Sequence, residues 1–321
     1  MNRKNVSLGT GLCLIASMSW GAMFPVAHSA LQFMDPLYFS FFRYFFVTVV
    51  LVILLVFKEG KSAFRLEGKG GILLFYGTMG FTLYNFMIFS GQDLMGDSGT
   101  IIASIMEALM PMITIVILWF RTKIKPARFM MISILIALTG ALLVITNGSL
   151  TFFAMAAEHL VPVLFIFIGA VGWVLYSLGG SQFGEWSVLR YSALTCLLGT
   201  VVSFFIVALG SLFGLLQTPD WHTLSSVKYQ MTFMVIFPGL IALLSWNAGI
   251  KMLSTVNGIL FMSVVPVTTF VLMALQGYKI SMNEFYGALL VIFALIQNNY
   301  YQRKSLRSLD LAENGALKKA L

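Results

Sequence analysis

Long apolar runs, separated by short polar stretches, fill almost the whole chain. A helix that crosses the roughly 30 Å hydrocarbon core of a bilayer needs about 20 predominantly apolar residues, and each run is close to that length. The pattern predicts ten membrane-spanning helices. They cover residues 6–27, 36–57, 71–92, 98–120, 128–146, 160–180, 188–216, 231–250, 256–276 and 282–300.

Composition agrees with this reading. Hydrophobic residues make up 59% of the chain and charged residues only 10%, whereas soluble domains carry roughly 25% charged residues. A water-soluble fold could not bury so much apolar surface. The predicted fold class is an all-α integral membrane protein.

The basic residues indicate orientation. The chain has 20 Lys and Arg residues and a net charge of +8. With the N-terminus inside, seventeen of the 20 fall on the inner side, Lys228 and Lys279 fall outside, and Arg43 lies within a span. Because short inner loops are enriched in Lys and Arg, we expect both termini inside. The charge therefore reports topology, and nucleic acid is not an expected partner.

The two halves echo each other. Matching residues recur at offsets of 147 to 155 residues, which predicts a five-helix unit duplicated once. Because five is odd, the second copy would start on the opposite side of the membrane, giving inverted repeats related by a pseudo-two-fold axis in the membrane plane. The matching pairs are Trp20 with Trp173, Pro111 with Pro266, and Arg43-Tyr44 with Arg190-Tyr191.

Several stretches resemble one known family. SWGAMFP, LYFSFFRYFF, ALMP, the basic loop RTKIKPAR and ISILIALTGALLVI are similar to one EamA repeat, and SVVPVTTFVLMALQGYKISMNEFYGALLVIFALI is similar to a second. The resemblance implies an EamA permease of the drug/metabolite transporter superfamily, whose members have ten helices and in many cases export amino acids or other small metabolites. We expect repeats at 1–150 and 151–303 and a cytoplasmic basic tail at 304–321. The position that matches Glu107 is Met262, so that carboxylate is not duplicated.

Glu107 and Pro111 stand out within the fourth span. Pro111 cannot donate to the carbonyl four residues earlier, which belongs to Glu107 itself. An acidic group at the bilayer centre costs roughly 3 kcal/mol, so both features should face a cavity or a partner. Helical spacing places a small, polar stripe on one face of this span, a candidate cavity wall. The stripe consists of Thr100, Ala103, Ser104, Glu107, Pro111 and Thr114.

Similar depth in the membrane suggests a central pocket. Aromatic walls and amide groups from both halves would hold a small amphipathic solute there, and closure would alternate between the two faces. Pro111 and Pro266 are candidate gating bends, with a static kink as the alternative. The candidate substrate-binding residues are Glu107, Trp20, Tyr84, Asn85, Trp173, Tyr176, Asn247 and Arg43.

Other interpretations stay open. Glu107 could carry a proton, bind a substrate ammonium, or form a structural ion pair with Arg43. Arg43 could instead clasp a neighbouring helix end, Trp20 and Trp173 could simply pack, and Arg190 could anchor the orientation.

The expected function is secondary transport by alternating access. The solute would be an amino acid or a related amphipathic metabolite, most simply exported, with protons as a candidate coupling ion. We expect a multi-pass protein of the cell membrane, such as a bacterial inner membrane, that contacts lipids and acts as a monomer or homodimer. A membrane-embedded enzyme acting on a lipid-like substrate is the alternative. It would need convergent catalytic groups, which the spans do not supply, so we expect no enzymatic activity, cofactor or metal site.

Overall fold

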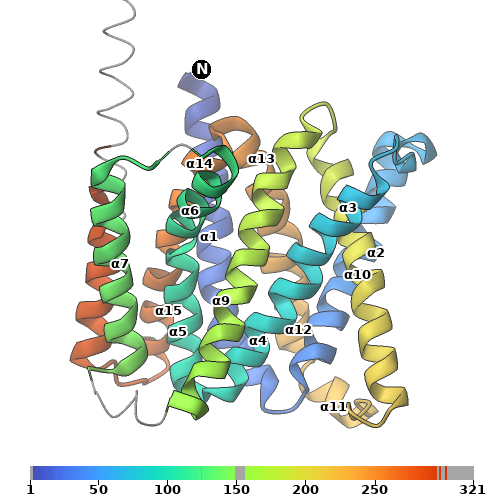
Figure 1. Ribbon diagram of the computed structural model, residues 1–321. Coiled ribbons are helices and arrows are strands. Elements are labelled where there is room, and N and C mark those ends of the chain that lie inside the picture. Colours follow the sequence, from blue (N-terminus) through green and yellow to red (C-terminus); the bar gives the residue numbers. More distant parts are fainter. Residues whose placement is uncertain (1–2, 124, 149–155, 295, 298–300, 302–321) are drawn as a thin grey trace, which may run out of the picture.

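The computed structural model describes residues 3–123, 125–148, 156–294, 296–297 and 301, and in this part of the chain all regular structure is helical (Figure 1). The first half contains α1 (Arg3–Leu31), α2 (Pro36–Glu59), α3 (Gly70–Gly77), α4 (Tyr84–Leu94), α5 (Gly96–Ala108), α6 (Met110–Thr122) and α7 (Arg128–Thr146). The second half contains α9 (Ala156–Gly179), α10 (Val188–Leu212), α11 (Trp221–Ser226), α12 (Lys228–Met234), α13 (Ala242–Leu253), α14 (Thr255–Gly258) and α15 (Val264–Leu275).

Eight helical segments of the described chain are long and apolar enough to cross a membrane. The pair α5 and α6 makes a ninth if its two bent parts form one span, and the helix Met282–Ala294 is apolar but shorter. The predicted tenth span at 282–300 runs into residues outside the described part of the chain, as does the predicted tail at 304–321.

The fourth predicted span is not a continuous helix. The helix breaks at Leu109, and the axis of α6 is bent by 46° from that of α5. Pro111 is the second residue of α6, where its missing N–H breaks no bond of that helix, because the first turn of a helix lacks intrahelical acceptors. The span therefore bends beside this proline, and the gating role of Pro111 stays a prediction.

The ninth predicted span contains α14, a 3-10 segment at Ile259–Ser263 and α15, with Pro266 in the first turn of α15. The third span of each half also departs from a regular α-helix, through π-helical segments at Thr78–Leu83 and Val235–Ile241. Such segments are frequent at functional sites. The seventh span ends at Leu212, earlier than expected. Gly214, with φ 70°, turns the chain there, and the amide of Leu215 donates to the carbonyl of Gly210.

The two halves pack on each other reciprocally. The first helix of one half, α1, packs on α13 from the third span of the other half, and α9 packs on α4 in the same way. The second helices, α2 and α10, pair with each other, and there Thr48 and Thr200 share a 2.9 Å hydrogen bond. Each contact thus has a counterpart in the other half, as expected for two repeats related by a two-fold axis.

Some of these contacts depend on glycine. A Cβ at Gly77 would lie 2.3 Å from the carbonyl oxygen of Thr195, and one at Gly199 would lie 2.3 Å from that of Gly77. Gly140 and Gly287 approach each other in the same reciprocal way, each virtual Cβ falling 2.6 Å from the other's carbonyl oxygen. Small residues allow such close approach between membrane helices.

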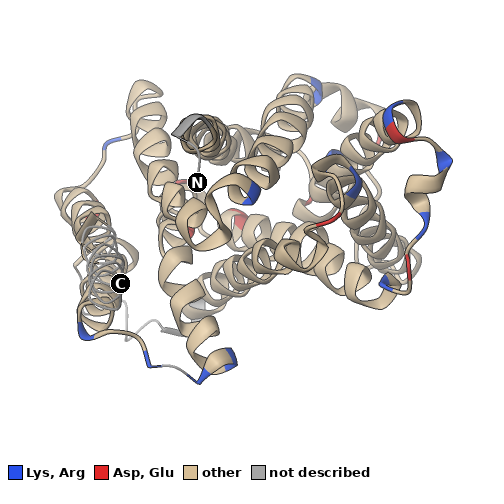
Figure 2. Ribbon diagram, turned by 90° about the horizontal axis from the view of Figure 1, so that it is seen from above, with Lys and Arg blue, Asp and Glu red and all other residues tan. Residues whose placement is uncertain are grey.

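Charge divides the two ends of the bundle. At one end the loops at 58–69, 121–128 and 184–190 carry most of the described Lys and Arg residues (Figure 2), and we call this end the basic face. The opposite face contains the contacts between Tyr38 and Ser211 and between His28 and Asp97. Lys228 and Lys279 adjoin helix ends on that opposite face.

Candidate functional site

Aromatic rings from both halves meet at the centre of the bundle. The rings of Trp20 and Trp173 lie 5.1 Å apart edge to face, and Trp246 lies 5.2 Å from Trp20. Tyr84 and Tyr176 each lie 5.1 Å from Trp173. All five side chains are buried. Because Trp20 and Trp173 occupy matching places in α1 and α9, their contact lies where the two halves meet.

Glu107 borders this cluster from the end of α5 and is only 1% exposed. The hydroxyl of Tyr84 donates a hydrogen bond to its Oε1. The ion pair with Arg43, one of the three alternatives for Glu107, is not formed in the described structure, where the ion pairs join His28 to Asp97 and Arg190 to Glu67. That alternative was wrong, because neutral side chains of α4 hold both charged groups.

Arg43 projects from α2 and is fully buried. Its Nη1 donates to Asn85 Oδ1 at 3.2 Å and contacts the sulfur of Met23 at 3.2 Å. The guanidinium carbon lies 4.8 Å from the ring centre of Tyr44. These contacts fix the plane of the guanidinium.

The amide of Asn85 connects this arginine to the π-helical segment. Its Nδ2 donates to the carbonyl oxygens of Gly80 and Phe81 at 3.2 and 3.1 Å. These carbonyls belong to the irregular turn at Thr78–Leu83, where backbone acceptors are left for side chains. The local break in the helix therefore helps to hold Asn85, and through it Arg43.

Asn247 joins the cluster to an open cavity. Its Nδ2 donates to the hydroxyl of Tyr176 at 2.7 Å and to Ser192 at 2.8 Å. Among the described residues its Oδ1 has no hydrogen-bond partner. Asn247 and Tyr191 line a cavity of about 380 Å³ that is bounded by the loop at 180–188. The cavity thus lies on the side of the basic face and reaches the edge of the central cluster.

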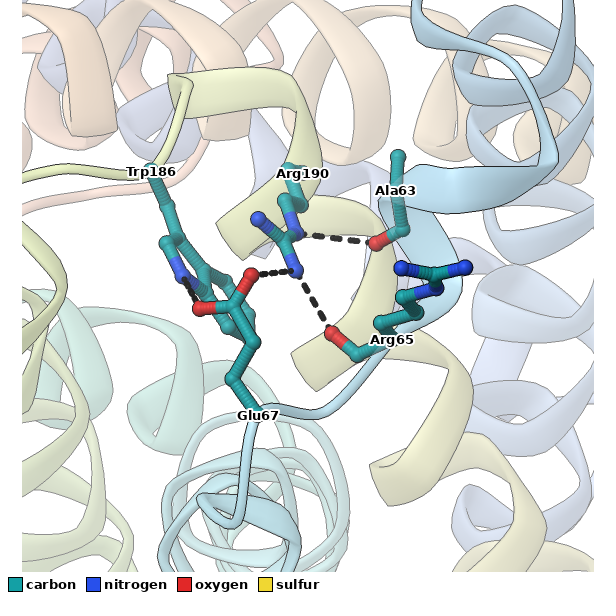
Figure 3. Close-up of polar contacts among 5 residues, drawn as sticks. All are labelled: Ala63, Arg65, Glu67, Trp186 and Arg190. Atoms are coloured by element: carbon teal, nitrogen blue, oxygen red, sulfur yellow. Dashed lines mark hydrogen bonds and ion pairs between the residues drawn. The ribbon is translucent and has the colours of Figure 1, made fainter.

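Polar contacts join Ala63, Arg65, Glu67, Trp186 and Arg190 in a set that we call the clasp (Figure 3), and Trp186 also lines the cavity. Arg190 Nη2 lies 2.7 Å from Glu67 Oε1, and Arg190 also donates to the backbone oxygens of Ala63 and Arg65. Trp186 Nε1 donates to the other carboxylate oxygen of Glu67 at 2.9 Å, and the guanidinium of Arg190 lies 3.8 Å from the Trp186 ring centre. Since Trp186 lines the cavity, the clasp ties a loop of the first half to its wall.

The clasp is electrostatically favourable. The hydrogen bonds from Arg190 and then Trp186 lower the pKa of the Glu67 carboxyl from its ordinary value, so it is ionised at neutral pH. Lys251 reinforces the same loop, since its Nζ donates to the carbonyl oxygens of Gly184 and Trp186 at 2.8 Å each.

Comparison with known proteins agrees with this architecture. The model of the EamA-like transporter family matches residues 7–146 and 160–300. The chain belongs to this family. EamA transporters form part of the drug/metabolite transporter superfamily, so this is a multi-pass membrane protein of a transporter family and its relatives point away from an enzyme.

Two curated relatives of this EamA protein come from Bacillus subtilis (strain 168). "Uncharacterized transporter YrdR" is 53% identical over 304 residues, which cover 95% of this chain and 95% of the relative. "Uncharacterized transporter YyaM" is 27% identical over 286 residues, which cover 87% and 90%. A solved crystal structure of a protein 19% identical covers 93% of this chain and 98% of its own, with a TM-score of 0.68, and shares the fold.

The structure of this EamA protein brings six of the eight predicted substrate-binding residues into one contiguous group, and the other two, Arg43 and Asn85, adjoin it because Asn85 follows Tyr84 in α4. Arg43 touches Asn85, Tyr84 touches Glu107 and Trp173, and Trp173 touches Trp20 and Tyr176. Tyr176 in turn touches Asn247. The rings pack closely against each other, and of the eight residues it is Asn247 that lines the cavity.

Other expectations need correction or addition. Arg43 and Arg190 do not occupy matching places, because Arg43 is fully buried within the bundle while Arg190 lies in the first turn of α10 and contacts Ala63 and Glu67. Sequence reasoning missed Trp246 and the clasp. Trp246 directly precedes Asn247, and the acidic Glu67 within a basic loop was a usable signal. Nothing in the sequence showed which loop of the other half it would meet.

Proposed function

We propose that this protein is a secondary transporter that moves a small amphipathic metabolite, with amino acids as the leading class, across the cell membrane by alternating access. The observation that carries this proposal is the central group of aromatic and polar side chains, to which both repeats contribute, with a cavity leading toward it from one face. Sites at the interface of two repeats are typical of secondary transporters.

The proposed topology has ten crossings, two inverted five-helix repeats and both termini in the cytoplasm. The charge difference between the two faces supports it, because Lys and Arg concentrate on cytoplasmic loops. With the basic face in the cytoplasm, the cavity opens inward. This conformation would collect a solute from the cytoplasm, which is the first step of export. Since one chain supplies both repeats, either a monomer or a homodimer would hold complete sites.

Alternating access requires one side of the site to close as the other opens. On the basic face the clasp and the loop at 180–188 border the cavity, so their movement would widen or narrow its mouth. The broken fourth span with Pro111 and the irregular ninth span with Pro266 are the proposed hinges. Helix breaks at such places absorb changes in backbone angle more readily than regular helix does.

Glu107 is the proposed chemical centre. A buried carboxylate can bind a substrate ammonium or exchange a proton between the two faces, and both roles require it to be released from Tyr84 during the cycle. The position within the central group supports a role in the transport cycle over a purely structural one. A pH gradient distinguishes the two roles. If Glu107 couples transport to protons, a pH gradient should drive transport and transport should generate a pH gradient; if Glu107 only binds the ammonium, neither should occur.

Counterflow in proteoliposomes tests the proposal. Purified protein is reconstituted into vesicles loaded with an unlabelled amino-acid mixture, and uptake of the same labelled amino acids is followed. A transporter of this class gives transient accumulation above the level in protein-free vesicles. Absence of counterflow, together with turnover of a labelled phospholipid, would refute transport and favour a membrane-embedded enzyme.

A further inference from the structure

One edge of the buried Arg43 guanidinium carries no partner. Nη1 is engaged with Asn85 and Met23, but Nε and Nη2 have no hydrogen-bond partner among the described residues, although the residue is 0% exposed. The N–H groups of Nε and Nη2 point in the same direction from the planar guanidinium, which is the geometry that binds both oxygens of a carboxylate. Leaving two charged donors buried without acceptors is costly, so this arrangement calls for an explanation.

The arginine is also held in place. Asn85 restrains one end, the Tyr44 ring lies against the guanidinium, and Asn85 is fixed in turn by two backbone carbonyls. The unpartnered edge is therefore presented in a defined direction. A purely structural arginine would turn this edge toward a backbone carbonyl or an acidic side chain.

The two buried charges of the first repeat do not form an ion pair with each other in the described structure, although they are close enough to interact electrostatically. Arg43 on α2 is held by Asn85, and Glu107 on α5 is held by Tyr84, so adjacent residues of α4 keep the cation and the anion in separate contacts. The indole Nε1 of Trp173, in the same aromatic cluster, is a further buried donor without a partner in the described structure. Such a site complements a ligand that carries both signs of charge and an apolar body.

We propose that the Nε and Nη2 edge of Arg43 binds the carboxylate of a zwitterionic amino-acid substrate, whose ammonium group faces Glu107. This assignment rests on the proposed function and specifies its substrate class. It makes Arg43 a substrate-binding residue, and it explains why the cation and the anion at the centre have neutral partners. Inorganic phosphate would offer similar oxygens to a guanidinium, so it is included as a competitor in the test.

The test measures transport while the charged groups of the ligand and the side chain at position 43 are changed separately and together. The probe is the amino acid that gives the highest counterflow rate in the mixture, together with its carboxamide and its decarboxylated amine. The protein variants are wild type, Arg43→Lys, Arg43→Gln and the control Arg121→Gln, which alters an exposed side chain outside the clasp and the cavity. Thermal unfolding and tryptophan fluorescence report whether each variant is folded.

The wild type is expected to carry the amino acid at least about tenfold faster, at subsaturating concentration, than the amide or the amine. Arg43→Lys keeps the charge but loses the two-pronged geometry, so this preference should shrink about tenfold or more, as it should for Arg43→Gln. Arg121→Gln should keep it. Equal rates for acid and amide in the wild type overturn the assignment even if no Arg43 variant folds.

The failures of the two proposals are distinguishable. Counterflow of an amino acid with unchanged acid preference in folded Arg43 variants overturns the role of Arg43 and leaves transport standing. Competition by inorganic phosphate as strong as that by the amino acid also overturns the carboxylate assignment. No counterflow with any amino acid overturns the Arg43 assignment and the amino-acid class, and transport itself is overturned when turnover of a labelled phospholipid accompanies that result.

Discussion

Tyr84 donates a hydrogen bond to Glu107, and this contact joins a phenol of α4 to the most buried acidic side chain of the described residues. The acceptor belongs to α5, immediately before the break at Leu109. A carboxylate in this position, held by a neutral hydroxyl, can exchange that hydroxyl for another donor when the helices rearrange. A structural ion pair would resist such an exchange much more strongly.

Removing the hydroxyl of Tyr84 should destabilise the folded protein, because the buried carboxylate of Glu107 loses its hydrogen-bond donor. We expect Tyr84→Phe to lower the free energy of unfolding by about 1–3 kcal/mol, because the substitution leaves a buried acceptor without its donor. In the Glu107→Gln background the same change should cost less, since the acceptor is then neutral. Thermal or denaturant unfolding in detergent measures both effects, with the exposed Tyr286→Phe as the control. Equal costs in the two backgrounds would contradict coupling between Tyr84 and Glu107.

The clasp should depend on pH in a defined direction. Glu67 has a lowered pKa in the folded protein, so its contribution to stability is present above the unfolded-state value, about 4.3, and is lost as the pH falls through the lower folded value. We therefore expect Glu67→Gln to be less stable than wild type at pH 7 and equal to it in stronger acid. The difference in melting temperature between the two proteins, measured from pH 7 to pH 3, checks this. A difference that grows on acidification would contradict the assignment.

Opening the clasp should also expose the cavity. Ser254 lines it, and the native cysteines Cys13 and Cys196 are buried. In a Ser254→Cys background we expect Arg190→Gln to increase the rate of labelling by a membrane-impermeant maleimide several-fold. The matched change Arg121→Gln, whose side chain is exposed and lies outside the clasp, should leave the rate unchanged. Slower labelling after loss of Arg190 would show that the clasp holds the cavity open.

The glycine contact between the repeats should tolerate no added carbon. A Cβ at Gly77 meets backbone at 2.3 Å, whereas Gly71, in the same helix, has nothing within 4 Å. We expect Gly77→Ala to destabilise the protein by about 1–3 kcal/mol through overpacking, and Gly71→Ala to be neutral or slightly stabilising. The melting temperatures of the two variants in detergent show whether Gly77→Ala is the less stable. Similar values would mean that α10 can move away from α3 at little cost.

The proposed orientation predicts opposite labelling at the two faces. Lys61 lies in the loop after α2, Gln217 lies in the loop after α10, and both are exposed. In intact cells an impermeant maleimide should label Gln217→Cys and spare Lys61→Cys, and inside-out vesicles should reverse the result. Labelling of Lys61→Cys in intact cells would place the basic face outside.

Much of this fold can be predicted from the sequence, because the thickness of the bilayer sets the length of each apolar run. The contact between Trp20 and Trp173 was also within reach, since matching residues near a two-fold axis can meet. The π-helical segments could not be predicted from the sequence. In the first repeat no proline marks the segment at Thr78–Leu83, and it accompanies the close approach of Gly80 to Tyr176, which is a tertiary contact.

Pairings between side chains were harder to predict than their depth. Depth placed Arg43 and Glu107 in one layer and suggested an ion pair. Depth does not reveal that Tyr84 and Asn85, adjacent on α4, reach Glu107 and Arg43 separately. The clasp was missed for a related reason, since it joins a loop of one repeat to the end of a helix in the other.

Counterflow with Glu107→Gln in parallel tests the central claim most directly. Wild type, Glu107→Gln and the exposed control Glu185→Gln are reconstituted at equal density, and thermal unfolding first establishes that each is folded. The account predicts counterflow in wild type and Glu185→Gln and a reduction of at least about tenfold in Glu107→Gln, because hydrogen bonds to a charged group contribute about 1.5–3 kcal/mol. Equal counterflow in all three, at every pH from 5.5 to 8, would contradict a transport site centred on Glu107.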